Sequence, residues 1–132
     1  MLPAVSGPTS RGQKLIYLVD DEDLLLEMAA VALQHDGYEL KKFQDPEAAY
    51  ASFANEAAKP SLLLTDYAME SMTGVELSEK CKGVHPELKI LMVSGTAGPE
   101  IVRECQVPVD EFIAKPYKPA HLADVVRSLL QD

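Results

Sequence analysis

Short apolar runs recur along the chain and predict β-strands that are buried on both faces. Such strands show continuous rather than alternating hydrophobicity. Four runs follow this pattern, and a fifth mixes apolar with charged residues, as is typical of an edge strand. The four buried strands are expected at Leu15–Val19, Leu62–Thr65, Ile90–Val93 and Glu111–Ala114, and the edge strand at Tyr38–Phe43.

Helical patterns separate these runs. In Asp23–Gln34, four apolar residues follow the i, i+3, i+4, i+7 spacing of one helix face, and Gly37 supplies the helix exit. The strict alternation of strands and helices predicts one α/β domain, with a parallel sheet covered by helices on both faces. The other expected helices are Pro46–Ala57, Gly74–Lys82, Pro99–Cys105 and a last one carrying Leu122, Val125, Val126, Leu129 and Leu130.

Length and charge narrow the class of protein. The 132 residues suffice for one domain, and the net charge of −9 repels the phosphate backbone of nucleic acid, so no direct nucleic-acid binding is expected. No apolar run is long enough to span a membrane. Residues 1–13 lack the pattern of a secretion signal and are expected to be a flexible leader before a domain at 14–132. The lone Cys81 and Cys105 suit free thiols in the cytoplasm.

Polar residues follow the strong strands at their carboxyl ends, where parallel α/β sheets bind ligands. They are the acidic run Asp20–Asp23, then Asp66, Ser94 and Lys115. Carboxylates close together repel unless a cation joins them, and Mg²⁺ prefers such oxygen ligands. A metal, a carboxylate nucleophile, a lysine and a hydroxyl together suit phosphoryl transfer onto aspartate. Carboxylates after a strand are also typical of a helix N-cap and first turn, which would account for Glu22 and Asp23.

Four segments carry a resemblance to a known family. They read "LIYLVDDE", "LLLTDYAMESMTGVEL", "ILMVSGTAG" and "FIAKPYKP". From about Lys14 to Leu130, the chain resembles the receiver domains of two-component response regulators. The resemblance implies a doubly wound (βα)5 fold with a five-stranded parallel sheet in the flavodoxin-like order 2-1-3-4-5. It also implies a cis bond between Lys115 and Pro116.

The resemblance further implies a metal site. Asp66 would be the phosphoacceptor and, with Asp21, would hold Mg²⁺ through its carboxylate. The backbone carbonyl of Ala68 would be a third protein ligand, and Asp20 would act mostly through water. Ala68 also occupies a position that, in this family, tunes autodephosphorylation, as does Thr96.

A switch is implied beside the metal. Lys115 would bind a phosphoryl oxygen, and Ser94 would move to hydrogen-bond the phosphoryl group. Phe112 occupies the aromatic switch position, whose ring moves inward as the hydroxyl shifts. Two residues depart from the usual pattern: Glu70 stands where the family often has Pro, and Gly95 stands where Ala is more usual.

The resemblance implies a histidine kinase or a histidine phosphotransfer domain as phosphodonor. Leu24, Leu25 and Met28 widen the apolar stripe of the first helix, so this helix is a candidate docking surface, although the stripe could equally pack on neighbouring loops. We expect a monomer or a weak homodimer. The sequence does not indicate the downstream target or whether the domain stands alone or belongs to a longer protein.

Two other functions compete with this one. A receiver-like interaction module that does not use phosphorylation would be signalled by loss of the acidic pair, Asp66 or Lys115, and none is lost. A small Mg²⁺-dependent phosphatase with an aspartyl-phosphate intermediate would need a second aspartate two residues after the nucleophile, where this chain has Ala68.

Overall fold

The computed structural model describes residues 14–131, so the expected leader at 1–13 lies outside the described residues. Five strands form one sheet in the order β2-β1-β3-β4-β5, and all neighbouring strands are parallel. This confirms the expected doubly wound α/β fold and its strand order. The strands are β1 (Leu15–Val19), β2 (Glu39–Phe43), β3 (Leu62–Asp66), β4 (Lys89–Ser94) and β5 (Glu111–Ala114).

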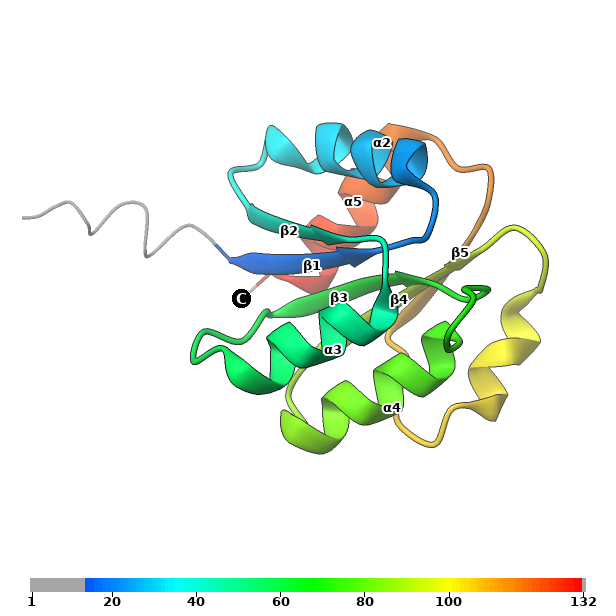
Figure 1. Ribbon diagram of the computed structural model, residues 1–132. Coiled ribbons are helices and arrows are strands. Elements are labelled where there is room, and N and C mark those ends of the chain that lie inside the picture. Colours follow the sequence, from blue (N-terminus) through cyan, green and yellow to red (C-terminus); the bar gives the residue numbers. More distant parts are fainter. Residues whose placement is uncertain (1–13, 132) are drawn as a thin grey trace, which may run out of the picture.

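Helices cover both faces of the sheet (Figure 1). One face carries α2 (Asp23–Gln34) and α5 (Pro119–Leu129), and the other carries α3 (Pro46–Asn55) and α4 (Gly74–Val84). None of these helices combines the length with the apolar character needed to cross a lipid bilayer, within the described part of the chain.

Each face of the sheet has its own buried core, because neighbouring residues of a strand point to opposite faces. In β1, Ile16 and Leu18 belong to the core under α2 and α5, whereas Tyr17 and Val19 belong to the core under α3 and α4. The strands are therefore apolar on both sides, as the continuous runs predicted. Tyr17 of β1 is buried, and its phenol hydroxyl lies 2.9 Å from the hydroxyl of Ser52 on α3.

Two expected helix ends were wrong. Helix α4 continues through Gly83 to Val84, because Gly83 keeps the helical course rather than the left-handed conformation of a terminating glycine. The helix is capped instead by His85, whose backbone (φ −141°, ψ 88°) leaves the helical region before Pro86. Helix α3 ends at Asn55, two residues before the expected end.

The segment between β4 and β5 holds a 3₁₀-helix rather than an α-helix. This element, η1 (Pro99–Glu104), is six residues long and buries only Ile101. With so little apolar surface to bury, the segment gains little from a full α-helical turn against the sheet. The connection from β4 to β5 therefore covers less of the sheet than the other three connections between strands, which contain α-helices.

Candidate phosphoacceptor site

Four of the predicted site residues converge at the carboxyl edge of the sheet. Asp66 and Ser94 are the last residues of β3 and β4, and Asp20 and Lys115 directly follow β1 and β5. These four strands are adjacent in the sheet, which brings together residues far apart in the sequence. A cavity of about 430 Å³ opens at this edge, lined by Asp21, Glu22, Asp66, Ala68, Gly95, Thr96 and Lys115.

Three carboxylates form the centre of the site. Asp20, Asp21 and Asp66 each place an oxygen within 4.8 Å of the others. Asp20 and Asp66 are almost fully buried, at 6% and 7% exposed, and Asp21 is more exposed. Oxygen ligands about 2.0–2.1 Å from Mg²⁺ lie about 4.1 Å apart when they face each other across the ion. Adjacent oxygen ligands of an octahedral Mg²⁺ lie only about 2.9 Å apart, and at most one pair among three ligands can lie opposite each other. The oxygen donors therefore suit a magnesium ion, which would draw the carboxylates closer together.

Lys115 lies against two of these carboxylates. Its Nζ is 2.9 Å from Oδ2 of Asp20 and 3.1 Å from Oδ1 of Asp66. Burial alone would lower the pKa of Lys115, but the hydrogen bond and charge of Asp20, together with Asp66, raise it above its usual value. The lysine is therefore held in its charged form.

The side chains of the site carry more negative than positive charge. Burial raises the pKa of Asp66; the charge of Lys115 opposes this rise, whereas Asp20 and Asp21 add to it. A single ammonium group thus offsets three carboxylates only in part. The cluster is suited to a cation that lies among all three of them.

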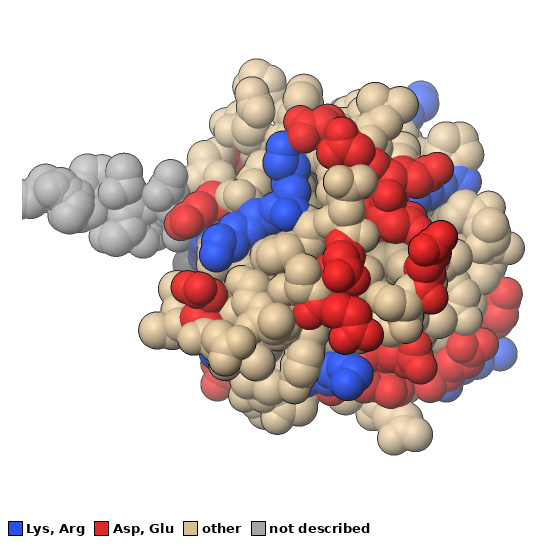
Figure 2. All heavy atoms as spheres, in the orientation of Figure 1, with Lys and Arg blue, Asp and Glu red and all other residues tan. Residues whose placement is uncertain are grey.

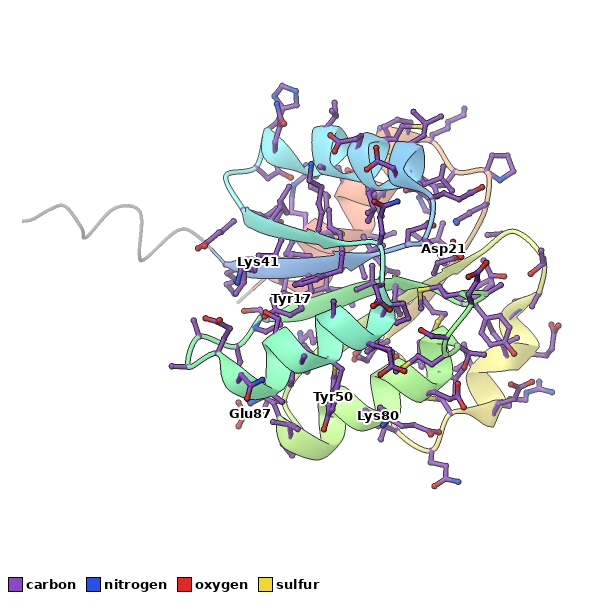
Figure 3. The ribbon with its side chains drawn as sticks, in the orientation of Figure 1. Tyr17, Asp21, Lys41, Tyr50, Lys80 and Glu87 are labelled. Carbon is purple, nitrogen blue, oxygen red and sulfur yellow. The ribbon has the colours of Figure 1, made fainter. Side chains whose placement is uncertain are left out.

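The turn after β1 fixes Asp20. Its backbone N–H donates to the carbonyl of Phe43 at 3.1 Å, and its Oδ1 accepts from the N–H of Glu22 at 2.9 Å. Glu22 stands at the N-cap of α2 but its side chain makes no cap hydrogen bond, while Asp23 lies in the first helical turn. Figure 3 labels Asp21 at this turn, beyond the end of β1. The acidic run thus serves both the site and the helix start.

The loop from β3 to α4 packs tightly against the backbone of Asp66. Thr73 and Glu76 form a capping box, with hydrogen bonds of 3.1 and 2.9 Å, that starts α4. A Cβ on Gly74 would lie 2.4 Å from the carbonyl oxygen of Asp66. Only glycine fits there, so the helix start sits directly against the candidate phosphoacceptor. The sequence pattern Thr-x-x-Glu is the signal for this cap.

Ser94 and Phe112 are not among the residues that line the cavity. The hydroxyl of Ser94 accepts hydrogen bonds from the N–H groups of Thr96 at 3.2 Å and Ala97 at 2.9 Å, within its own loop. Its carbonyl accepts from the N–H of Lys115 at 2.8 Å. Phe112 is half-buried and packs against the core under α3 and α4. The Lys115–Pro116 bond is cis, as the resemblance implied.

The first helix, α2, exposes an apolar face near the site. Leu24 is 70% and Met28 46% exposed, whereas Leu25 is half-buried. Val31, which the sequence analysis did not single out, is 57% exposed and extends the same face one turn further. The i, i+4, i+7 spacing of Leu24, Met28 and Val31 was the available signal.

Acidic side chains gather on this side of the molecule. Figures 1 and 2 share one orientation. Most of the Asp and Glu side chains, red in Figure 2, lie on the side where Figure 1 shows the carboxyl ends of the strands. Negative charge around the cavity is the opposite of what a nucleic-acid backbone requires.

Comparisons with known proteins identify the family. The model of the response regulator receiver domain matches residues 16–127. This chain belongs to that family: it is a receiver domain of two-component signal transduction, and accepting a phosphoryl group is the family's function.

The matched segment spans nearly all of one relative and only part of two others. The response regulator receiver protein CpdR of Brucella abortus is 32% identical over 116 residues, which cover 88% of this chain and 93% of CpdR. The phosphate regulon transcriptional regulatory protein PhoB of Pseudomonas aeruginosa is 31% identical over 89% of this chain, which spans only about half (52%) of PhoB. The sensor kinase CckA of Brucella abortus is 28% identical over 91% of this chain and 13% of CckA.

A solved structure supports the fold. The CheY-like response regulator receiver domain protein of Methanospirillum hungatei is 31% identical, with a TM-score of 0.80 over 88% of this chain and 92% of that one.

Proposed function

We propose that Asp66 is the phosphoacceptor and that it receives a phosphoryl group from a phosphorylated histidine with the aid of Mg²⁺. The observation that carries this proposal is the ion pair between Lys115 Nζ and Asp66 Oδ1, 3.1 Å long, inside an open cavity that two further aspartates share. A charged lysine beside a carboxylate supplies the positive charge that a phosphoryl oxygen needs.

The reaction moves one phosphoryl group between two side chains. An oxygen of Asp66 attacks phosphorus, the phosphorus–nitrogen bond of the donor histidine breaks, and the imidazole leaves with the bonding electron pair and takes up a proton. The Lys115 ammonium offsets charge on a phosphoryl oxygen throughout. Asp20, Asp21, Asp66 and the carbonyl of Ala68 would hold Mg²⁺, which supplies further positive charge to the phosphoryl oxygens.

Ser94 and Phe112 would transmit the modification. The Ser94 hydroxyl would leave the N–H groups of Thr96 and Ala97 and donate to a phosphoryl oxygen. The half-buried ring of Phe112 would then follow into the space near the loop. The side chains at Ala68 and Thr96 would set how fast water removes the phosphoryl group, and Ala68 offers no polar atom to orient that water.

The phosphodonor would be a histidine kinase or a histidine phosphotransfer domain in the cytoplasm, docking on the apolar face of α2. Leu24 and Met28 supply most of the exposed apolar surface there, and Leu25 supports them from a half-buried position. Burial of such side chains at an interface stabilises a complex.

Phosphotransfer profiling against the kinases and phosphotransfer domains of the source organism tests this docking surface. Leu24→Ala should slow transfer from the preferred protein donor about tenfold and leave labelling by acetyl phosphate unchanged. Val84→Ala, which trims an exposed apolar residue of α4, is the matched control. Equal transfer rates for all three proteins would remove α2 from the interface.

Intact-mass spectrometry after incubation with Mg²⁺ and acetyl phosphate tests the phosphoacceptor. We expect one phosphoryl addition, lost in Asp66→Asn and in the presence of a chelator. Asp45→Asn is the matched control, because Asp45 caps α3 through the N–H of Glu47 and asparagine caps a helix equally well. No addition, where a control receiver is labelled, would favour an interaction module that works without phosphorylation.

A further inference from the structure

A second polar cavity lies at the opposite edge of the sheet, where β1, β3 and β4 begin. It encloses about 220 Å³, and its polar lining includes Lys14, Lys59, Ser61, His85, Glu87 and Lys89. Figure 3 labels Glu87 at this end of the molecule, far from Asp21 at the other end. The cavity therefore has no part in the phosphoacceptor site.

Backbone carbonyls hold the lysine side chains at this cavity. Lys14 Nζ donates to Leu130 O at 2.8 Å and Lys89 Nζ donates to Leu129 O at 2.6 Å, both at the end of α5. The two acceptor carbonyls belong to consecutive residues, so both ammonium groups are held at the same end of α5.

The third lysine is held in the same way from the other side of the cavity. Lys59 Nζ donates to Phe53 O at 2.5 Å and Glu56 O at 2.7 Å, at the end of α3. An ammonium group fixed before a ligand arrives loses less conformational entropy when it binds one.

Hydrogen-bond donors remain available after these contacts. An ammonium group has three N–H donors. Among the residues that the structure describes, Lys89 donates to one acceptor and so keeps two N–H donors for a ligand. Lys59 donates to two acceptors and keeps one. The hydroxyl of Ser61 makes no side-chain hydrogen bond within the same residues, and Ser61 immediately precedes β3, between the starts of β1 and β4.

The described residues that line this cavity are richer in lysine than the chain as a whole. Three lysines face one glutamate here, whereas the chain carries a net charge of −9. Ammonium groups gathered in one place repel one another, and an anion between them removes that repulsion. Several N–H donors and a hydroxyl on different elements suit an anion with oxygens on several sides.

We propose that this cavity binds a small phosphate-type oxyanion, either inorganic phosphate or the phosphate group of a monoester. Lys59 and Lys89 donate to its oxygens from opposite sides, Ser61 donates from between them, and Lys14 adds charge. The site is independent of Asp66 and of magnesium.

The test is an NMR titration of the ¹⁵N-labelled protein with sodium phosphate, in EDTA and at constant ionic strength. We expect saturable amide shifts confined to residues 59–61, 85–89 and 129–131. Lys59→Gln and Lys89→Gln should each weaken binding at least fivefold, because glutamine keeps a hydrogen-bond donor but removes the charge. Lys118→Gln, which removes an exposed lysine near the phosphoacceptor end, should leave the affinity unchanged.

Parallel titrations identify the ligand. If adenosine monophosphate binds as tightly as inorganic phosphate, the site recognises the phosphoryl group alone. If adenosine monophosphate binds more tightly, the ligand is a phosphate monoester. Equal shifts with sodium acetate would overturn the phosphate class. Linear shifts, shifts centred on Asp66 and Lys115, or an affinity unaltered in Lys59→Gln would overturn the site itself. If Lys89→Gln fails to fold, Lys59→Gln decides alone.

Discussion

Gly74→Ala should destabilise the domain by pushing the start of α4 away from β3. The added Cβ would lie 2.4 Å from the carbonyl oxygen of Asp66 and 2.7 Å from Sδ of Met92. The methionine side chain can move aside, but the carbonyl belongs to a buried strand and moves only with its backbone. Overpacking of this kind costs about 1–3 kcal/mol, and a backbone clash belongs at the upper end, about 3 kcal/mol.

Thermal and urea unfolding measure this effect. A loss of about 3 kcal/mol lowers Tm by about 10 °C in a chain of this length. Phosphorylation by acetyl phosphate should fall as well, because the residue that is displaced is the proposed phosphoacceptor itself. The matched control is Gly83→Ala, later in the same helix, where an added Cβ meets nothing within 4 Å.

The two glycines should respond in opposite directions. Alanine is the better helix former by about 1 kcal/mol, so Gly83→Ala should raise Tm. If Gly74→Ala unfolded at the wild-type temperature, the close approach of α4 to Asp66 would not constrain the fold. If both variants lost stability equally, the loss would come from the helix backbone rather than from the contact.

Three other variants or measurements probe the site and the core. Burial raises the pKa of Asp66 in the folded protein above its value in the unfolded chain. The carboxyl therefore stabilises the folded state at pH values below the unfolded pKa, and this contribution is lost as the pH rises through the folded pKa. In EDTA, Asp66→Asn should therefore be more stable than wild type in urea at pH 7, by a margin that vanishes near pH 4. Burial raises the pKa of Cys81 to about 12, which leaves a thiolate fraction of about 10⁻⁴ at pH 8. Iodoacetamide should then modify the half-buried Cys105 in the native protein and reach Cys81 only in urea; native labelling of Cys81 would contradict its burial. In Gly95→Ala, the added Cβ lies no closer than 3.5 Å to Lys115. The substitution should raise the free energy of unfolding by about 0.4–1 kcal/mol. A loss above about 1 kcal/mol would show that alanine cannot adopt the backbone conformation of Gly95.

The alternation of strands and helices was sufficient to predict a parallel α/β sheet, and the family resemblance supplied the order of its strands. Parallel strands send their carboxyl ends to one edge, so Asp20, Asp66 and Lys115 meet once their strands are adjacent, as they are in the sheet. The rotamer of Ser94 was not predictable, since its hydroxyl can bond either its own loop or a ligand, and only the structure shows which.

Helix ends were harder to predict from local signals. Gly83 reads as a stop signal, yet the helix continues until Pro86 forces the preceding residue out of the helical region. The exposed Val31 was missed for a related reason: α2 carries two apolar stripes, and the core stripe with Leu26 and Leu33 dominates the pattern.

The order of the strands has a consequence for how the chain acquires its structure. Asp20 and Asp66 come from the first half of the chain, whereas Lys115 follows the last strand, which pairs only with β4. Until β5 docks, the two buried carboxylates face each other without their cation, and their mutual repulsion opposes closure of the first half. Contacts between residues so distant in sequence form late. We therefore expect β5 to complete the domain and the Lys115 ion pairs to report that the last step of folding has occurred.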